Sequence, residues 1–530
     1  MASFFSGGTI WCGIGRVAQT LRVESGVIVE INGAASAGDE IIDLHGGFLA
    51  PAFMDGHAHP LFGGREAQGP LVNGLQSLSE MIAEVKRFAG ANPDTPWIIG
   101  GAYEAAVVGG GDFLADWLDE AVSDRPVVLQ AVDHHTIWVN KKALEIAGIT
   151  AATADPDGGT IARNPDGSPR GTLREPAAMD LIMKHAPART LQDDVAAIAW
   201  ASDRYLESAV TAAVDAWVEP GMAEAYIAAE KSGALKIDMN LFFLAQPENW
   251  RDRISYFANL RDQINSLGVN SKLAAKTIKI IGDGALSAGT AALLHPYLDD
   301  PISRGLLIWQ DDELLDAAVI FDAAGYQLHM HAIGDAAVRQ ALDVIEKLIA
   351  INPKWDRRPV IAHAQLIDPA DLSRFASLGV IANYQPLWTY LDPMNEKLIA
   401  PRIGEARNSA QYQLATMVKS GARVSYGSDW PVTSYIPLAA LAVPTHRQSP
   451  DHLPPEGWSP QEAISVEESL SFYTAGVAYQ CFNEGRFGEI AVGAQADLMV
   501  LSQNPMELAP HDVSGIKILA VYKSGVAVVG

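Results

Sequence analysis

The stretch Ala52-Phe-Met-Asp-Gly-His-Ala-His59 is the first of eight short, mainly apolar runs that we interpret as β-strands. Helical patterns fall between these runs, and such alternation is typical of a parallel sheet joined by crossover helices. Eight strands favour a (β/α)8 barrel, with a doubly wound sheet as the alternative. The predicted strands are Ala52–His59, Thr211–Val218, Asp238–Ala245, Lys276–Gly282, Tyr326–His331, Val360–Ala364, Val380–Gln385 and Arg423–Ser428. The predicted helices include Leu191–Ser208, Met222–Lys231, Asp311–Ala324, Asp335–Ala350 and Asn408–Ser420.

Strand-like runs also occur at both ends of the chain, at Gly26–Ile31, Glu40–Leu44, Asp497–Leu501 and Ile518–Tyr522. We therefore predict an α/β fold in which residues 1–50 and 485–530 form one small, discontinuous β-sandwich domain and residues 51–484 form the barrel.

The connection between the first two barrel strands is longer than a crossover requires. It contains the strand-like runs Trp97–Gly101 and Pro126–Ala131, the helix-like Asn140–Ala147, and the glycine- and proline-rich stretch Asp155–Gly171. We interpret residues 65–195 as an insertion over the active-site mouth of the barrel.

The composition excludes some classes of function. Of 530 residues, 48% are hydrophobic, and 38 basic against 63 acidic residues give a net charge of −25. An acidic chain is a poor partner for nucleic acid or for an anionic membrane surface. No apolar run reaches the roughly 18 residues that span a bilayer, and the start of the sequence lacks a signal-peptide pattern, so we expect a cytoplasmic protein. Cys12 and Cys481 stand too far apart in sequence to indicate a disulfide framework or a zinc–cysteine site.

Histidines follow several predicted strands at their carboxyl ends. His57 and His59 share one face of the first strand, where two imidazoles could bind a divalent ion, although two polar residues in a turn are the alternative. His331, His363 and Asp429 come at the ends of three later strands. Barrel enzymes build their sites from strand ends, so these residues predict a convergent metal site. His329 shares a face with His331, and spacing alone does not choose between them.

Six motifs in order resemble the amidohydrolase superfamily, in particular its YtcJ-like branch, which includes N-substituted formamide deformylases. They are Pro51-Ala-Phe-Met-Asp-Gly-His-Ala-His59, Asp133-His-His-Thr-Ile-Trp-Val-Asn140, Gly171-Thr-Leu-Arg-Glu175, Ile278-Lys-Ile-Ile-Gly-Asp-Gly284, His331-Ala-Ile-Gly-Asp335 and Gly427-Ser-Asp-Trp-Pro431. The segment from Gly488 to Val500 is similar to the family's carboxyl-terminal sheet. Ala52 and Gly56 stand where the family has glycine and serine, and neither departure removes a donor atom.

The resemblance implies a ligand set of His57, His59, Lys279, His331, His363 and Asp429, and it assigns His331 rather than His329. Asp429, Lys279 and His363 are the implied catalytic residues, with Asp429 as the base. In many relatives the lysine reacts with carbon dioxide to give a carbamate that bridges two metal ions, an anionic form that nearby dications favour. The expected cofactor is therefore two Zn²⁺ ions, with one ion as the alternative. An unmodified Lys279 paired with Asp283 or another carboxylate is the alternative to the carbamate.

The implied reaction is hydrolysis of a carbon–nitrogen bond in an N-substituted formamide or another small acyl amide. A metal-activated hydroxide attacks the carbonyl carbon, and Asp429 passes the proton to the departing amine. The candidate substrate-binding residues are His135, Trp138, Glu175, Trp388 and Trp430. Tyr390 is a further aromatic candidate, and a core position is the alternative for each aromatic residue. Glu175 has a neighbour, Arg174, that offers an ordinary ion pair.

Other functions stay open at this point. Cyclic amides, carbamates, ureas and lactones are alternative substrates, and a decarboxylase could use the same metal site. A non-catalytic regulatory homologue is a further alternative. The expected partners are a small-molecule amide and, since acidic barrels frequently associate, a second copy of the chain in a homodimer.

Overall fold

Eight parallel strands form the central sheet of the computed structural model, which describes residues 2–109, 111–132 and 136–530. The strand order is β20-β19-β18-β17-β16-β15-β14-β8. The strands are β8 (Phe53–Asp55), β14 (Val210–Val218), β15 (Asp238–Ala245), β16 (Leu273–Ile281), β17 (Gln327–Ala332), β18 (Val360–His363), β19 (Ile381–Tyr384) and β20 (Arg423–Tyr426). The amide of Gly56 donates to the carbonyl of Tyr426 at 2.8 Å and that of Asp429 to the carbonyl of His57 at 2.7 Å, which brings the two edge strands together. The predicted barrel is confirmed, and every predicted barrel strand is present.

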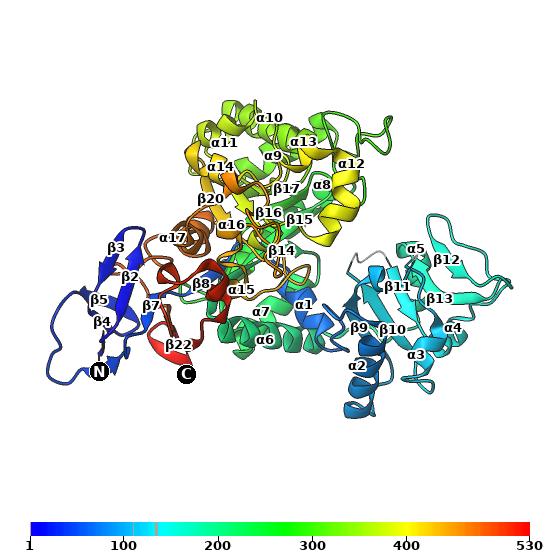
Figure 1. Ribbon diagram of the computed structural model, residues 1–530, viewed down its shortest axis with the longest axis horizontal. Helices are drawn as coiled ribbons and strands as arrows, with labels where there is room; N and C mark the ends of the chain where they lie inside the picture. Colours follow the sequence, from blue (N-terminus) through cyan, green and yellow to red (C-terminus); the bar gives the residue numbers. More distant parts are fainter. Residues whose placement is uncertain (1, 110, 133–135) are drawn as a thin grey trace. The chain divides into compact units, whose positions relative to one another are not determined.

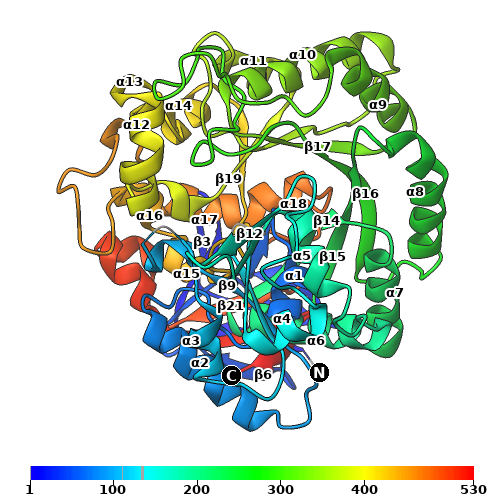
Figure 2. The same ribbon diagram turned by 90° about the vertical axis from the view of Figure 1, so that its right-hand side faces the viewer.

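Helices cover the outer side of this sheet, as Figure 2 shows for α7 to α11. In α10, the buried Val338, Ala341, Leu342, Ile345 and Leu348 recur at the spacing that puts one helix face on the sheet. The main barrel helices are α6 (Leu191–Glu207), α7 (Met222–Ser232), α8 (Trp250–Asn265), α9 (Asp311–Ala323), α10 (Asp335–Ile351) and α11 (Leu372–Leu378). Shorter helices follow at α12 (Ala400–Ile403), α13 (Glu405–Asn408), α14 (Leu414–Lys419), α15 (Pro437–Ala440), α16 (Val443–His446), α17 (Val466–Ser471) and α18 (Val477–Gln480).

The predicted helix Asn408–Ser420 is present only in part, as α14, because the chain leaves the helical path between α13 and α14. Gln411 forms an isolated antiparallel bridge with Leu366, and the amide of Tyr412 donates to the carbonyl of Gln365 at 2.9 Å. Tyr412 also has a positive φ of 51°, which no α-helix accommodates. Tertiary pairing therefore overrides the helical pattern here.

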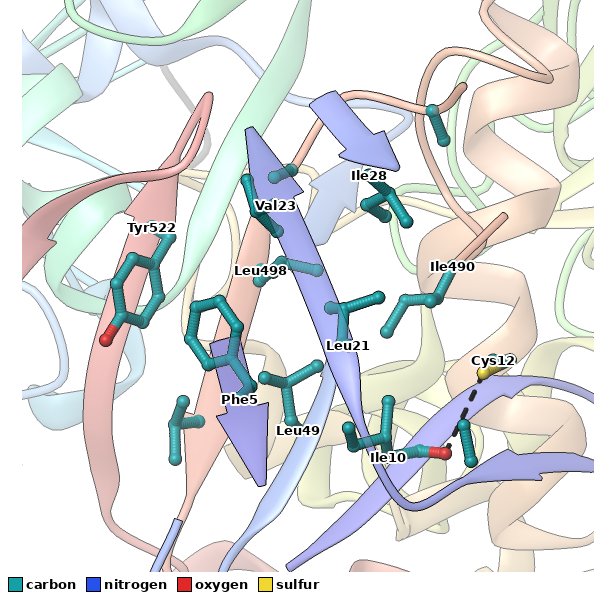
Figure 3. Packing of buried hydrophobic residues seen from close by; sticks show 14 of the residues in the cluster. Phe5, Ile10, Cys12, Leu21, Val23, Ile28, Leu49, Ile490, Leu498 and Tyr522 are labelled. Carbon is teal, nitrogen blue, oxygen red and sulfur yellow. Dashed lines mark hydrogen bonds between the residues drawn. The ribbon is translucent and has the colours of Figure 1, made fainter. Parts of the chain in front are cut away.

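The two ends of the chain meet in a six-stranded sheet of order β23-β22-β21-β7-β2-β3. Leu498 of β21 (Leu498–Leu501) pairs antiparallel with Pro51 of β7 (Phe48–Pro51), so the terminal pairing that we predicted is present. The other strands are β2 (Thr9–Gly13), β3 (Arg16–Ala18), β22 (Ile518–Lys523) and β23 (Val526–Val529). A four-stranded sheet of β5 (Val27–Ile31), β4 (Leu21–Glu24), β1 (Ser3–Ser6) and β6 (Glu40–Asp43) accompanies it. Figure 1 shows these strands at the two ends of its colour range, and Figure 3 shows the apolar side chains that both sheets bury together.

Residues 61–201 form a second compact unit, separate from the unit of residues 1–60 and 202–530. Its sheet has the order β12-β13-β11-β10-β9. The strands are β9 (Ile98–Tyr103), β10 (Val127–Ala131), β11 (Thr136–Val139), β12 (Thr160–Arg163) and β13 (Pro169–Arg174), with helices α1 (Pro60–Glu66), α2 (Leu78–Ala91), α3 (Ala115–Asp119), α4 (Lys141–Ala147) and α5 (Pro176–Met183). The two strand-like runs and the helix-like run predicted in this part are all present, whereas β12 and the start of β13 lie in the glycine- and proline-rich stretch and were not expected. Within the described part of the chain, no helix is long and apolar enough to cross a membrane.

Candidate metal centre

Three side chains from different barrel strands converge at the carboxyl ends of those strands. His57 follows β8, His363 ends β18, and Asp429 follows β20. Each offers one ligand atom, these atoms all lie within 4.8 Å of one another, and all three side chains are buried. A buried group of two imidazoles and one carboxylate is a donor set that suits a divalent transition metal.

The other predicted ligands surround this group. The Nε2 atom of His59 lies 3.0 Å from Oδ1 of Asp429, and Nζ of Lys279 lies 3.2 Å from Nε2 of His57. The rings of His331 and His363 are 4.6 Å apart between centroids. The structure therefore brings all six predicted ligand residues into one cluster.

The charges of the cluster favour metal binding. Burial lowers the pKa of His363 to about 3 and that of His57 well below its usual value, so both imidazoles are neutral at physiological pH. Burial would raise the pKa of Asp429, but opposing effects, of which the hydrogen bond from His59 is the largest, lower it to about 2. Burial also lowers the pKa of Lys279 to about 7, against a smaller opposing effect of Asp429. Neutral imidazoles and an ionised carboxylate are the forms that bind metals.

Each of three histidines meets a different polar partner through its Nδ1 atom. His57 Nδ1 lies 2.8 Å from Nε2 of His329, His331 Nδ1 lies 3.2 Å from Oδ1 of Asp283, and His363 Nδ1 lies 2.7 Å from Oε1 of Gln385. The hydrogen-bonded partners of His57 and His363 orient these rings and set their tautomers, whereas Nδ1 of His331 forms no hydrogen bond with any residue that the structure describes.

These contacts also distinguish His329 from His331, between which sequence spacing did not choose. His329 is fully buried behind His57, whereas the ring of His331 lies against that of His363, which supports the assignment of His331 as a ligand. The carboxylate of Asp283 accepts from the backbone amides of Ile333, Gly334 and Ala292 in addition to its contact with His331. Asp283 is thus engaged at the His331 side of the cluster, not in the ion pair considered for Lys279.

Asp55 joins the first and last barrel strands beside the centre, a role that sequence reasoning missed. Its carboxylate accepts from the amides of Ser428 at 2.9 Å and His57 at 3.2 Å, and from the hydroxyls of Ser428 and Tyr205. Burial raises the pKa of Asp55 to about 6, although all these hydrogen bonds lower it. Its position two residues before His57 could have marked Asp55 as a candidate. Its role was not predictable, because its partner Ser428 is 373 positions away in the sequence.

The strand ends are tightly packed. A Cβ atom on Gly56 would lie 2.7 Å from the carbonyl oxygen of Tyr426, and one on Gly427 would lie 2.4 Å from Cβ of His57. Both approaches are closer than a side chain tolerates. The family has serine at the position of Gly56. In this chain strands β8 and β20 approach so closely there that only glycine fits without a shift.

Two of the converging residues have strained backbones. His363 has φ 72° and Asp429 φ 56°, both in the left-handed region that non-glycine residues seldom occupy. Such conformations cost about 1–3 kcal/mol each and cluster at functional sites, where the surrounding structure enforces them. This observation supports a functional role for both residues.

The predicted substrate-binding residues have different surroundings. Trp388 is half-buried and stacks on His363, with ring centroids 5.3 Å apart and planes 11° apart. Trp430 is buried, and its ring packs on Tyr205 and Tyr435. Its backbone carbonyl accepts a hydrogen bond from the amide of His59. Trp217, which sequence reasoning missed, has its ring 6.3 Å from that of His59.

Trp138 and Glu175 belong to the second unit. Trp138 is fully buried in that unit's apolar core, where its Nε1 donates to the carbonyl of Leu114, so the core alternative describes its position. Glu175 is exposed at the start of α5, and Arg174 forms its ion pair with Asp112. His135 lies outside the described residues. Tyr390, in the barrel unit, is half-buried.

The metal-free protein should lose thermal stability as the pH falls through the ordinary pKa of histidine. His57, His329 and His363 have pKa values below the roughly 6.5 expected in the unfolded chain. The unfolded chain therefore binds more protons, and stability is present above about pH 6.5 and is lost as the pH falls toward the folded pKa values. We expect the midpoint temperature of thermal unfolding to decrease as the pH is lowered from about 7.5 to about 6.

A comparison of variants isolates this effect. Asp55 and Glu66 have pKa values raised by burial to about 6 and about 7, so they act with the opposite sign. His329→Phe should reduce the pH dependence of the midpoint, whereas the exposed control His185→Ala should leave it unchanged. An equal pH dependence in His329→Phe and the wild type would contradict a buried neutral His329.

Comparisons with known proteins cover nearly the whole chain. Residues 40–529 match the amidohydrolase family. Protein LONG AFTER FAR-RED 3 of Arabidopsis thaliana is 30% identical over 96% of this chain and 88% of its own. The putative amidohydrolase YtcJ of Bacillus subtilis (strain 168) is 29% identical, covering 90% and 88%, and the N-substituted formamide deformylase of Arthrobacter pascens is 25% identical, covering 96% and 94%.

A solved structure has the same fold. It is that of an uncharacterized metal-dependent hydrolase from Pyrococcus horikoshii OT3, which superimposes with a TM-score of 0.77 at 23% identity. The similarity covers 96% of this chain and 99% of the other.

Proposed function

This chain belongs to the amidohydrolase family of hydrolases, and we propose that it is a metal-dependent enzyme that cleaves the carbon–nitrogen bond of an N-substituted formamide or another small acyl amide. The observation that carries the proposal is the convergence of His57, His363 and Asp429 within 4.8 Å, with His59, Lys279 and His331 around them. The similarity to a protein named N-substituted formamide deformylase supports the substrate class.

We propose that the six residues hold two Zn²⁺ ions. The buried donors fit zinc, since they combine neutral imidazoles with carboxylate oxygen. Lys279 supplies the bridging group when its neutral Nζ forms a bond to the carbon of carbon dioxide and releases a proton. The product is a carbamate whose single negative charge is shared by two oxygen donors. A pKa of about 7 leaves a large fraction of the amine neutral at physiological pH, as this reaction requires.

Bound zinc would lower the pKa of water and polarise the substrate carbonyl. Asp429 is ionised, and its Oδ1 lies 3.0 Å from Nε2 of His59 and 3.6 Å from Nε2 of His57. At this place among the ligands, its carboxylate could accept the proton of the attacking water. It then delivers that proton to the departing nitrogen, because expulsion of an unprotonated amine is costly. The surrounding buried side chains keep the carboxylate away from bulk solvent, which strengthens its electrostatic effect.

The position of the half-buried Trp388 is an argument that the substrate nitrogen carries an apolar substituent. Its indole stacks on His363 beside the centre and is not closed off in the core. A planar aromatic surface at this place would bind an aryl or alkyl group by burial of apolar area.

The test is turnover of a substrate panel by metal-depleted and zinc-reloaded protein. We expect reloading with zinc and bicarbonate to restore hydrolysis of N-substituted formamides, with weaker activity on acetamides and none on esters. Full activity in the metal-depleted protein would contradict the metal dependence. Turnover confined to cyclic amides, carbamates or esters would contradict the proposed substrate class.

A further inference from the structure

A row of buried amide side chains runs through the barrel from the backbone of Gly56, directly after the first strand, to His363. Its members are Gln480 at the end of α18, Asn383 in β19 and Gln385 just after β19. All three are fully buried, as is Ser425 beside them. Buried amides require partners for both their oxygen and their nitrogen.

The hydrogen bonds form one continuous series. Gln480 Nε2 donates to the carbonyl oxygen of Gly56 at 2.7 Å, and Gln480 Oε1 accepts from Asn383 Nδ2 at 3.2 Å. Asn383 Oδ1 accepts from Gln385 Nε2 at 3.1 Å. Gln385 Oε1 then lies 2.7 Å from Nδ1 of His363.

The direction of this series is fixed at its far end. A backbone carbonyl only accepts, so the nitrogen of Gln480 must face Gly56 and its oxygen must face Asn383. The nitrogen of Asn383 must then point to Gln480, and its oxygen must point to Gln385. In the same way Gln385 turns its nitrogen to Asn383, and only its oxygen is left for His363.

Ser425 reinforces this direction. Its hydroxyl donates to Oε1 of Gln480 and accepts from Nδ2 of Asn383 at 3.0 Å. A reversed Asn383 would therefore place its oxygen against the oxygen of Gln480 and leave Ser425 without a donor. A buried amide that faces a like partner loses its hydrogen bonds, so no amide of the series reverses alone.

We propose that Gln480, Asn383 and Gln385 are positioning residues that hold His363 in the tautomer protonated on Nδ1, which leaves its Nε2 lone pair available to a metal ion. This inference rests on the proposed function, in which His363 is a ligand. The opposite tautomer would set the Nδ1 lone pair of His363 against the oxygen of Gln385. The carbonyl oxygen of Gly56 thus fixes, through three amides, which ring nitrogen of His363 is protonated at the end of the sixth strand.

Asn383→Leu tests the relay most sharply, because Asn383 contacts Gln385 and not His363. With its partner removed, Gln385 is free to reverse and present its nitrogen to His363. We expect a loss of zinc affinity of about 10–100-fold, measured by competition with a chelator. Gln385→Leu should show a loss of the same size. The matched control is Gln340→Leu, which removes a buried glutamine that bonds to Trp309 and Asp311.

A second readout needs no metal. Nitrogen NMR of histidine-labelled, metal-free wild type should show His363 protonated on Nδ1, with its signals identified by their loss in His363→Ala. In Asn383→Leu the tautomer protonated on Nε2 should appear. Nε2 protonation in the wild type would overturn the inference even if the variants failed to fold.

Failure of the relay and failure of the proposed function are distinguishable. Wild-type zinc affinity in folded Asn383→Leu and Gln385→Leu would overturn the relay alone. A wild-type chain that binds no zinc would overturn the proposed function, and with it the metal-binding consequence of the relay.

Discussion

Asp429→Asn should reduce kcat for amide hydrolysis by about 10²–10⁴-fold, the range typical of a lost general base. The amide keeps an oxygen that can contact a metal ion and nearly the shape of the carboxylate, but it does not accept a proton at neutral pH. Zinc content should therefore change little while turnover is nearly lost. The measurement is kcat together with metal content on the same preparation.

The matched control is Asp322→Asn. Asp322 is also buried, but its carboxylate accepts from Arg357, Asn352 and Trp355 in the barrel wall. We expect this variant to lose stability and keep its kcat. Wild-type turnover in Asp429→Asn would remove Asp429 from its role as the base.

Lys279→Ala should lower the zinc content from about two ions to at most about one and reduce turnover by more than the 10–100-fold that loss of an outer partner costs. The physical reason is that alanine cannot form the carbamate that bridges the ions. In the wild type, bicarbonate should increase the zinc content of protein that has been depleted of carbon dioxide. Labelled bicarbonate should give one carbamate carbon signal that Lys279→Ala lacks.

Lys276→Ala controls for the loss of a lysine from the same strand. Lys276 lies three residues earlier in β16, and its side chain is exposed. This variant should keep zinc content, carbamate signal and turnover. Two tightly bound ions in Lys279→Ala would rule out the bridging role.

Much of the barrel could be predicted because its pattern is local. A short apolar run marks each strand, and each histidine and aspartate ligand lies near the carboxyl end of a strand. The family comparison confirms the resemblance inferred from six motifs. Histidine is distinctive enough that His57, His59 and His363 could be nominated from their positions alone, whereas the choice of His331 over His329 came from the resemblance.

The parts that could not be predicted depend on pairs far apart in sequence. Gln480 meets Gly56 across 424 positions, and single amides in strands carry no pattern that marks them. Asp55 stood inside a quoted motif, yet its function depends on Ser428. The helix predicted over 408–420 begins only at Leu414 for the same reason, because Gln411 pairs with a distant segment.

Anomalous scattering at the zinc edge from crystals grown with zinc and bicarbonate would locate the bound ions. We expect zinc peaks enclosed by His57, His59, His331, His363 and Asp429, with density for a carbamate on Lys279. Stoichiometric zinc bound elsewhere, with these side chains unliganded, would contradict the proposed metal centre.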